Sequence, residues 1–193
     1  MSQQQIPRLA HVVYRTRKFE QMLPWYKEVF HAKIQHQNPA MAFLTYDDEH
    51  HRLAFIDLSV VKPDVDDSEN RGLVGLEHIA YSFQSLESLL QNYTRLKSKG
   101  IMPYWCIHHG LTISMYYSDP DDNQLEFQVD CFESKKECND YICGPSFSVN
   151  PVGVEFEPED WLKQIQAGAS SDDFLVRKVH EPISPIRGAL SAM

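Results

Sequence analysis

One pattern of hydrophobic and polar positions occurs twice along the chain. The run LAHVVY at 9–14 reappears as LEHIAY at 76–81, and apolar residues three and four apart follow each run. This spacing places the apolar residues on one face of a helix, so each copy is predicted to begin with a short strand followed by an amphipathic helix. The two predicted faces consist of Phe19, Met22, Leu23, Tyr26 and Val29, and of Leu86, Leu89, Leu90, Tyr93 and Leu96.

Short apolar or alternating segments follow each predicted helix, and polar turns separate them. Such segments are typical of β-strands. With one further strand near Ile34 in the first copy and another at 103–107 in the second, each copy becomes a β-α-β-β-β module. The other predicted strands are 42–46, 52–56, 112–116 and 124–129.

The predicted fold class is α+β, with the two modules in tandem within one domain, 7–130. Module one covers 7–61 and module two covers 73–130. The charged segment 62–72 has no apolar periodicity and is predicted to be a linker. Residues 131–193 form a C-terminal extension, which we expect to pack on the core or on a neighbouring subunit.

The extension has a pattern of its own. Pro158 and the acidic residues after it suit the first turn of a short helix, which Gly168 can end. The segment around Pro182 and Pro185 lacks helical periodicity and is predicted to be an extended arm.

Composition places the chain among ordinary globular proteins. Its 193 residues are 42% hydrophobic and 23% charged, which favours a folded enzyme or binding domain. Lys and Arg number 18 against 27 Asp and Glu, for a net charge of −9, and no basic run exceeds a pair, which argues against a nucleic-acid partner. Neither a secretion signal nor an apolar stretch of bilayer length is evident, so we expect a cytoplasmic protein with no membrane partner.

The cysteines fit the same expectation. Without a secretion signal, thiols are normally kept reduced, so no disulfide is expected. The spacing of the three cysteines at 131–143 matches no CxxC zinc motif, so no metal site is predicted there. The four cysteines are Cys106, Cys131, Cys138 and Cys143.

Both copies carry a histidine at the same position of their first predicted strand, His11 and His78. A lone strand histidine is usually a hydrogen-bonded core residue, but two at equivalent positions of a repeat can converge on one metal ion. Glu126 is the candidate third ligand, because it alternates with Leu125 and Phe127 and therefore points to the opposite face of its strand. The alternative interpretation of Glu126 is a solvent-facing strand residue.

Module two also contains a recognisable succession of residues. It runs from His108-His109 through Tyr116 and Asp119-Pro120 to Glu126. Together with the paired modules, this succession resembles the vicinal oxygen chelate superfamily and, more narrowly, its type I extradiol ring-cleaving dioxygenases. The resemblance covers residues 7–130.

Module one carries a second element of the resemblance. The segment His50-His51-Arg52-Leu53 is similar to a strand of that family whose second histidine is catalytic, here His51. Simple solvation is the alternative for both histidines, which lie in a predicted turn. One departure is Asp122, which stands where the family signature usually has Gly or Pro; it affects the turn and not the chemistry.

The resemblance implies a fold and a metal centre. In the glyoxalase/bleomycin resistance/extradiol dioxygenase fold, two modules form a curved mixed sheet around a metal site. His11, His78 and Glu126 would hold Fe(II), with Mn(II) as an alternative in the same ligand set. Ala54 occupies the position in module one that corresponds to Glu126, whereas glyoxalase I-like relatives have a fourth ligand there. Three ligands leave positions open for a bidentate substrate and dioxygen.

The resemblance also implies a reaction. The substrates are a small catechol-type aromatic diol and O₂, and the ring is cleaved to a semialdehyde, as in the catabolism of aromatic hydrocarbons. His51 would stabilise negative charge on dioxygen and act as acid or base, and Tyr116 would hydrogen-bond the deprotonated diol oxygen. Tyr117 is the alternative inward-facing tyrosine. The further catalytic histidine is His109 or His108, and the signature favours His109.

Two other functions stay open. One is a different metal-dependent enzyme of the superfamily, a glyoxalase-like lyase or isomerase, and Ala54 argues against it. The other is a metal-free small-molecule binding protein, against which the joint presence of His11, His78 and Glu126 argues. Well-known family members often carry two pairs of modules and this chain carries one, so we expect a homo-oligomer that covers the remaining apolar surface.

Overall fold

The computed structural model describes residues 11–48, 51–63, 78–178 and 181–188. The chain divides into two compact units, Met1–Gly75 with Asp119–Asp121, and Leu76–Ser118 with Asp122–Met193. The start of each repeated run, His50 and most of the predicted linker lie outside the described residues. Within the described residues, no helix is both long and apolar enough to cross a membrane.

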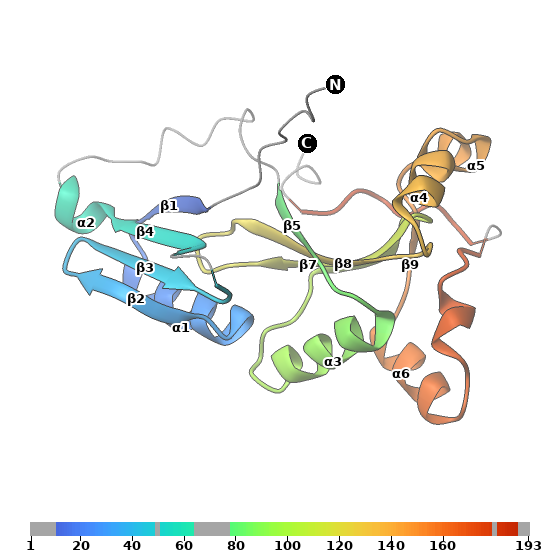
Figure 1. The fold of residues 1–193 in the computed structure, drawn as a ribbon, viewed down its shortest axis with the longest axis horizontal. Helices are drawn as coiled ribbons and strands as arrows, with labels where there is room; N and C mark the ends of the chain where they lie inside the picture. Colours follow the sequence, from blue (N-terminus) through green and yellow to red (C-terminus); the bar gives the residue numbers. More distant parts are fainter. Residues whose placement is uncertain (1–10, 49–50, 64–77, 179–180, 189–193) are drawn as a thin grey trace, which may run out of the picture. The chain divides into compact units, whose positions relative to one another are not determined.

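The first unit is built on a four-stranded mixed sheet with the order β1-β4-β3-β2 (Figure 1). Strand β1 runs parallel to β4, and the other neighbours are antiparallel. The sequence of elements is β1 (Val12–Thr16), α1 (Phe19–Phe30), β2 (Lys33–Asn38), β3 (Met41–Thr45), β4 (Leu53–Asp57) and α2 (Leu58–Val61).

The second unit repeats this arrangement and extends it to five strands, in the order β5-β8-β7-β6-β9. Strand β5 is parallel to β8, as β1 is to β4, and the remaining pairs are antiparallel. Its elements are β5 (His78–Ser82), α3 (Leu86–Lys97), β6 (Trp105–His108), β7 (Thr112–Ser118), β8 (Gln124–Asp130), α4 (Lys135–Ile142), α5 (Pro145–Val149), β9 (Val154–Glu155), α6 (Pro158–Gln166) and the 3₁₀ turn η1 (Ser171–Phe174).

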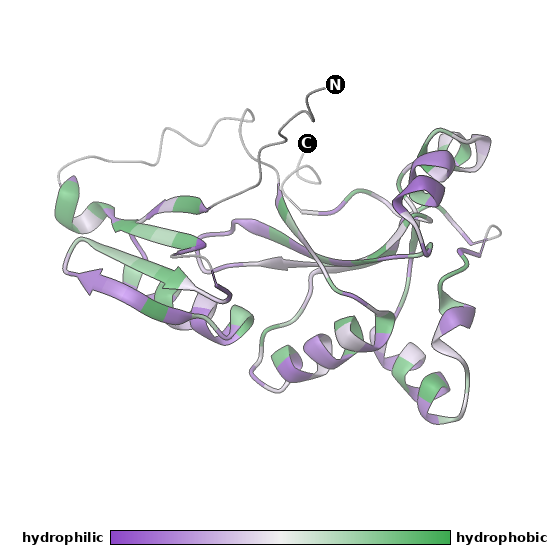
Figure 2. Ribbon diagram, in the orientation of Figure 1, coloured by the Kyte–Doolittle hydropathy of each residue, from purple (hydrophilic) through white to green (hydrophobic). Residues whose placement is uncertain are grey.

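Each unit buries one face of its sheet beneath a helix. Helices α1 and α3 bury all ten of the apolar residues that the sequence pattern assigns to their inner faces. Figure 2 shows the corresponding mixture of polar and apolar residues along α3, and the change from the polar β2 to the apolar β3 and β4. On the buried face of the first sheet, Tyr14 stacks on Phe55 with ring centroids 5.4 Å apart, and both rings contact Tyr26 of α1. Because strand side chains alternate, the residues between these point to the opposite face.

The two β-α-β-β-β modules are therefore confirmed, and the class is α+β. In the C-terminal extension, the predicted short helix is α6, with Pro158 in its first turn. The sequence pattern does not predict α4, α5 or β9. Strand β9 pairs antiparallel with β6 and becomes an edge of the second sheet. All four cysteines lie among the described residues, and none of them forms a disulfide.

Candidate active site

The strand registers show which residues occupy equivalent positions in the two units. In the second sheet, Glu126 of β8 lies opposite Ala80 of β5 and Tyr116 of β7. In the first sheet, Ala54 of β4 lies opposite Val13 of β1 and Phe43 of β3. The alignment of Ala54 with Glu126 is therefore confirmed by pairing as well as by sequence. A methyl group cannot bind a metal, so the first unit offers no carboxylate at this position.

Glu126 and His78 form the polar centre of the second sheet. The Nε2 atom of His78 lies 3.1 Å from Oε2 of Glu126. Glu126 is only 5% exposed, so the solvent-facing interpretation is wrong. Burial raises the pKa of its carboxyl group, but hydrogen bonds from His78 and Ser114 and the nearby His109 outweigh burial, and the net pKa is lowered. The group is held as a carboxylate, the form that binds metals.

Tyr116 and His109 lie beside this pair. Tyr116 is opposite Glu126 in the register, and its ring meets that of His78 edge-on, with centroids 5.4 Å apart. Its hydroxyl is 3.1 Å from Nε2 of His109, whose Nδ1 contacts the carbonyl oxygen of Val152. Tyr117, with the opposite orientation, packs on Phe127 beneath the sheet. Tyr116 is therefore the tyrosine on the face that carries Glu126.

The hydrogen bonds of His109 define its proton positions. A carbonyl oxygen can only accept, so Nδ1 must carry a proton and donate it to Val152. Burial lowers the pKa of His109, which favours the neutral ring, although the Val152 contact and Glu126 act in the opposite direction. In the neutral ring Nε2 is then unprotonated and accepts a hydrogen bond from the Tyr116 hydroxyl.

His108 has a different environment from its neighbour. Its ring is edge-on to Trp161 of α6, and its Nδ1 accepts a hydrogen bond from the backbone N–H of Gly110 at 3.0 Å. Burial lowers the pKa of His108 to about 4. It lines a cavity of about 290 Å³ beside α6 and the segment after η1. Of the two histidines that the sequence leaves as alternatives, the structure brings His109 to Tyr116.

The first unit places His11 beside His51. Their ring centroids are 4.3 Å apart, and Phe43 meets the His51 ring edge-on at 5.2 Å. Phe43 is the counterpart of Tyr116 in the register, so these rings gather on the face of the first sheet that corresponds to the Glu126 face of the second. His11 and His51 thus share one surface of their unit.

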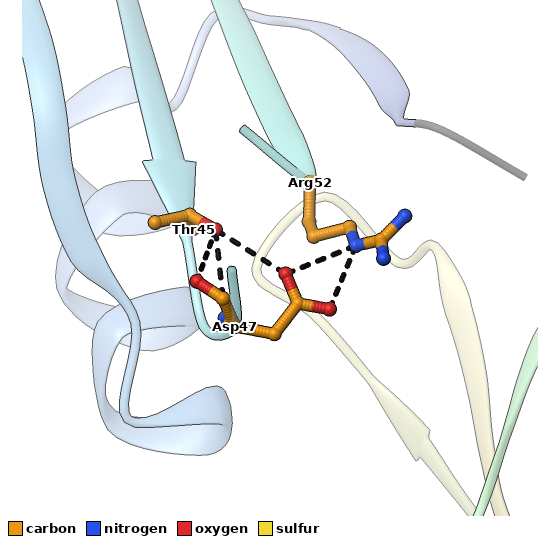
Figure 3. Close-up of polar contacts among 3 residues, drawn as sticks. All are labelled: Thr45, Asp47 and Arg52. Atoms are coloured by element: carbon orange, nitrogen blue, oxygen red, sulfur yellow. Dashed lines mark hydrogen bonds and ion pairs between the residues drawn. The ribbon is translucent and has the colours of Figure 1, made fainter. Parts of the chain in front are cut away.

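A small polar cluster of Thr45, Asp47 and Arg52 lies next to His51 in the sequence (Figure 3). The Arg52 guanidinium Nε donates to both carboxylate oxygens of Asp47, at 3.1 and 2.9 Å. The Thr45 hydroxyl donates to the Asp47 carbonyl oxygen at 3.3 Å. The backbone N–H of Arg52 also donates to the Leu44 carbonyl oxygen at 2.9 Å. Since Arg52 follows His51 directly, these bonds anchor the backbone on one side of the histidine.

The donor atoms of the second sheet suit a divalent transition metal. His78 offers an imidazole nitrogen and Glu126 a carboxylate oxygen, a combination that Fe(II) and Mn(II) both accept. Among the residues that the structure describes, no three His, Cys, Asp or Glu side chains form a complete metal-binding cluster. His11, the third ligand that the sequence predicts, lies in the first unit.

The sequence does not indicate the contact between Val152 and His109. Val152 acts through its carbonyl oxygen, which any residue possesses, so side-chain chemistry gives no signal. The only local indication is Asn150-Pro151, a dipeptide typical of turns.

Two β-α-β-β-β modules, each with a helix on one sheet face and titratable side chains on the other, define the vicinal oxygen chelate class. The model of the Glyoxalase/Bleomycin resistance protein/Dioxygenase superfamily matches residues 8–127, and the chain belongs to this superfamily.

Two relatives that are named as dioxygenases narrow the class of protein within this superfamily. The chain is 42% identical over 166 residues to biphenyl-2,3-diol 1,2-dioxygenase 2 of Rhodococcus globerulus, with 86% of this chain and 85% of the relative covered. It is 38% identical over 173 residues to biphenyl-2,3-diol 1,2-dioxygenase 3 of the same organism, with coverage of 89% and 88%. The protein is therefore an enzyme, a dioxygenase of this superfamily.

Solved structures agree on the fold. A glyoxalase/bleomycin resistance protein/dioxygenase from Nocardioides matches with a TM-score of 0.52 and 16% identity over 67% of this chain and 87% of that chain. The fosfomycin resistance protein FosX of Listeria monocytogenes matches with a TM-score of 0.51 and 18% identity over 69% and 99%. At such identities these matches establish the fold alone.

Proposed function

We propose that the protein is an Fe(II)-dependent extradiol dioxygenase, which inserts O₂ into a catechol-type aromatic diol and cleaves the ring to a semialdehyde. The observation that carries the proposal is the group on one face of the second sheet, where the His78–Glu126 pair lies beside the Tyr116–His109 pair. The two dioxygenase relatives, named for an aromatic diol, support it.

His11, His78 and Glu126 are the proposed metal ligands. The assignment of His11 rests on the repeat and on the family, since His11 has in the first module the sequence position of His78 in the second. Two histidines and one carboxylate form the ligand set of non-haem Fe(II) oxygenases, and Mn(II) fits the same donors. Bound Fe(II) would supply a Lewis acid and a route for electrons between the diol and dioxygen.

Tyr116 and His109 are proposed to take up a proton from the diol. Tyr116 donates its own proton to Nε2 of His109, which leaves the phenol oxygen able to accept a hydrogen bond from a diol hydroxyl. A proton leaving the diol can therefore be shared through Tyr116 with His109. The transfer of this proton leaves a negative charge on the diol, so the Tyr116–His109 pair favours the diol as an anion.

Trp105 completes the protein environment of this pair. Its ring stacks on Tyr116 with centroids 5.1 Å apart and meets His109 edge-on at 6.0 Å. Both Trp105 and Tyr116 are buried. Hydrogen bonds are stronger where water is excluded, so this packing strengthens the proposed proton path.

His51 is the proposed acid–base group toward dioxygen. Its ring packs beside that of His11, a proposed metal ligand. An imidazole titrates near neutrality and can stabilise developing negative charge and return a proton.

The glyoxalase-like alternative requires a fourth ligand. Ala54 occupies the register position of Glu126 and supplies none, which favours an oxygenase. We also propose that the protein forms a homo-oligomer, and sedimentation as a monomer at micromolar concentration would contradict this.

Activity toward diols tests the proposed function. The protein is loaded anaerobically with Fe(II) and then mixed with oxygen and a panel of catechol, 3-substituted catechols and 2,3-dihydroxybiphenyl. A yellow ring-fission product is expected, and Glu126→Ala should abolish it. The matched control is Gln128→Ala, two residues along the same strand, which should keep activity. Failure of the wild-type protein to cleave any diol despite stoichiometric iron binding would overturn the proposal.

A further inference from the structure

We propose that Arg177, in the C-terminal extension, is a positioning residue for His109. Its hydrogen bonds hold in place the backbone carbonyl of Val152, and this carbonyl sets the tautomer of the His109 ring. The importance of this tautomer for turnover rests on the proposed function. The tautomer itself does not, and can be measured without metal or substrate.

Arg177 joins two loops that adjoin the paired strands β6 and β9. Its Nη1 donates to the carbonyl oxygen of His109 at 2.9 Å and to that of Asn150 at 2.8 Å. Its Nη2 donates to the carbonyl oxygen of Ser146 at 3.2 Å, and the guanidinium lies over the ring of Tyr141. One planar group therefore ties the backbone of the catalytic histidine to the backbone that carries its hydrogen-bond acceptor.

The acceptor loop is closed by Asn150. Its side-chain oxygen accepts from the backbone N–H of Gly153 at 2.7 Å, and its side-chain N–H₂ donates to the Gly153 carbonyl oxygen at 3.2 Å. Val152 lies inside this closed turn, with its carbonyl oxygen against Nδ1 of His109. The hydrogen bond from Arg177 to the Asn150 carbonyl holds the start of this turn relative to His109, and the pairing of Val154 with His108 holds its end.

The turn also fits closely against the sheet. Gly153 has φ +123°, and a Cβ atom at this position would lie 2.6 Å from the carbonyl oxygen of His108. Only glycine allows this approach. The carbonyl of Val152 can therefore reach His109 only while the turn keeps this conformation.

Loss of the Val152 contact would change the direction of the Tyr116 hydrogen bond. A neutral imidazole without an acceptor at Nδ1 is free to carry its proton on Nε2 instead. Nε2 would then donate to Tyr116 rather than accept from it, and the phenol could no longer pass a proton to His109. Binding of the diol depends less on this direction than turnover does, so kcat should fall more than KM changes.

Lysine cannot replace arginine in this role. An ammonium is a compact charge on a flexible stem, whereas the guanidinium presents several donors in a fixed plane. Arg177→Lys keeps the charge and should still lose the simultaneous contacts to the two loops. Arg187→Met is the matched control. Arg187 also ties the extension to the sheet, through two contacts with Glu155 at 2.5 and 3.1 Å, and these contacts involve neither His109 nor its acceptor loop.

The experiment records the tautomer directly. Long-range ¹H–¹⁵N correlation spectra of metal-free protein with ¹⁵N-labelled histidine distinguish protonated from unprotonated ring nitrogens, and His109→Asn assigns the signals. We expect the wild-type and Arg187→Met proteins to show His109 protonated at Nδ1 alone. Arg177→Met and Arg177→Lys should show the Nε2-protonated form or a mixture of the two forms.

Kinetics supply the second readout. In the iron-loaded enzyme, Arg177→Met should lower kcat roughly 10-fold or more, by analogy with other residues that orient a catalytic group, while KM stays within about 3-fold. Arg187→Met should leave kcat near the wild-type value. A folded Arg177 variant in which His109 is protonated at Nδ1 alone would overturn the proposal. If Arg177→Met does not fold, Arg177→Lys provides the test. Absence of activity in the wild-type enzyme would overturn the proposed function instead and leave the tautomer result standing.

Discussion

The hydroxyl of Tyr116 donates its hydrogen bond to His109, 3.1 Å away, because the other nitrogen of that ring is committed to a backbone carbonyl. The direction of this bond matters more than its length. A histidine that accepts can take up a proton, whereas one that donates cannot. Under the proposed function, this direction would let the pair withdraw a proton from a bound diol.

Replacement of Tyr116 by phenylalanine tests the proton path. The ring and its stacking on Trp105 are kept and the hydroxyl alone is lost. We expect kcat to fall about 100-fold, the lower range for loss of a proton-transferring group, with little change in stability. Steady-state kinetics with the best diol provide the measurement. Tyr81→Phe, on the helix-covered face of the same sheet, should keep activity. An unchanged kcat in Tyr116→Phe would show that this hydroxyl takes no part.

Metal affinity should depend on Glu126. In Glu126→Gln an amide replaces the carboxylate at nearly the same volume, so one charged donor is lost from the proposed ligand set. Titration with Fe(II) or Mn(II) under anaerobic conditions should show affinity reduced by more than the roughly 10- to 100-fold that changes outside the ligand shell cause. Equal affinity in wild-type and variant proteins would exclude Glu126 as a ligand.

His108 should make the stability of the metal-free protein depend on pH. Burial lowers its pKa to about 4 in the folded state, against 6.5 in the unfolded chain. Between these values the unfolded chain binds a proton that the folded protein does not. The contribution of His108 to the free energy of unfolding is therefore fully present above pH 6.5. It is lost as the pH falls toward 4, and the free energy of unfolding then decreases by about 1.4 kcal/mol per pH unit.

Urea unfolding across this pH range provides the measurement. His108→Gln removes the titrating group and keeps an acceptor for the Gly110 N–H, so the free energy of unfolding should fall less steeply with acid. A variant with the same slope as the wild-type protein would show that folding does not lower the pKa of His108.

Ser184 should stabilise the extended arm of the second unit. Its hydroxyl oxygen accepts from the indole N–H of Trp105 at 3.0 Å and donates to Glu155 at 2.8 Å. Ser184→Ala would leave the buried indole N–H without this acceptor, at a cost of about 1–3 kcal/mol in the free energy of unfolding.

The matched control for this change is Ser98→Ala, whose hydroxyl donates to the Arg95 carbonyl oxygen at an exposed helix end. It should change stability by no more than about 0.5 kcal/mol. Denaturant unfolding of both variants compares the two serines, and equal effects would mean that the arm contributes nothing specific through Ser184.

The sequence predicts the modules because their helices and strands follow periodic burial. The ten apolar positions that the spacing places on the inner faces of α1 and α3 are all buried, and the strand pairing that equates Ala54 with Glu126 follows from flanking apolar residues. The extension is predicted less well. Its helix α6 has a Pro and acidic first turn, but β9 is two residues long and too short for any periodicity to appear.

The candidate site shows the same division. Histidine, glutamate and tyrosine side chains reveal their chemistry by their identity and spacing. Spacing alone cannot separate His108 from His109, because the two residues are adjacent and differ in which way each ring points; only the family signature favours His109. Arg177 lies far from both in sequence and acts on backbone carbonyls, which leave no trace in the residues that provide them.

The short strand β9 has a consequence for how this sequence can diverge. Its pairing with β6 uses main-chain groups, so Val154 can be exchanged for other apolar residues without loss of the pairing. Gly153 cannot, because its φ of +123° and its contact with the His108 carbonyl exclude a Cβ atom. Among related sequences that keep this arrangement, we expect a glycine at the position of Gly153 even where the neighbouring residues differ. Related chains without this glycine should have a different backbone conformation in the extension.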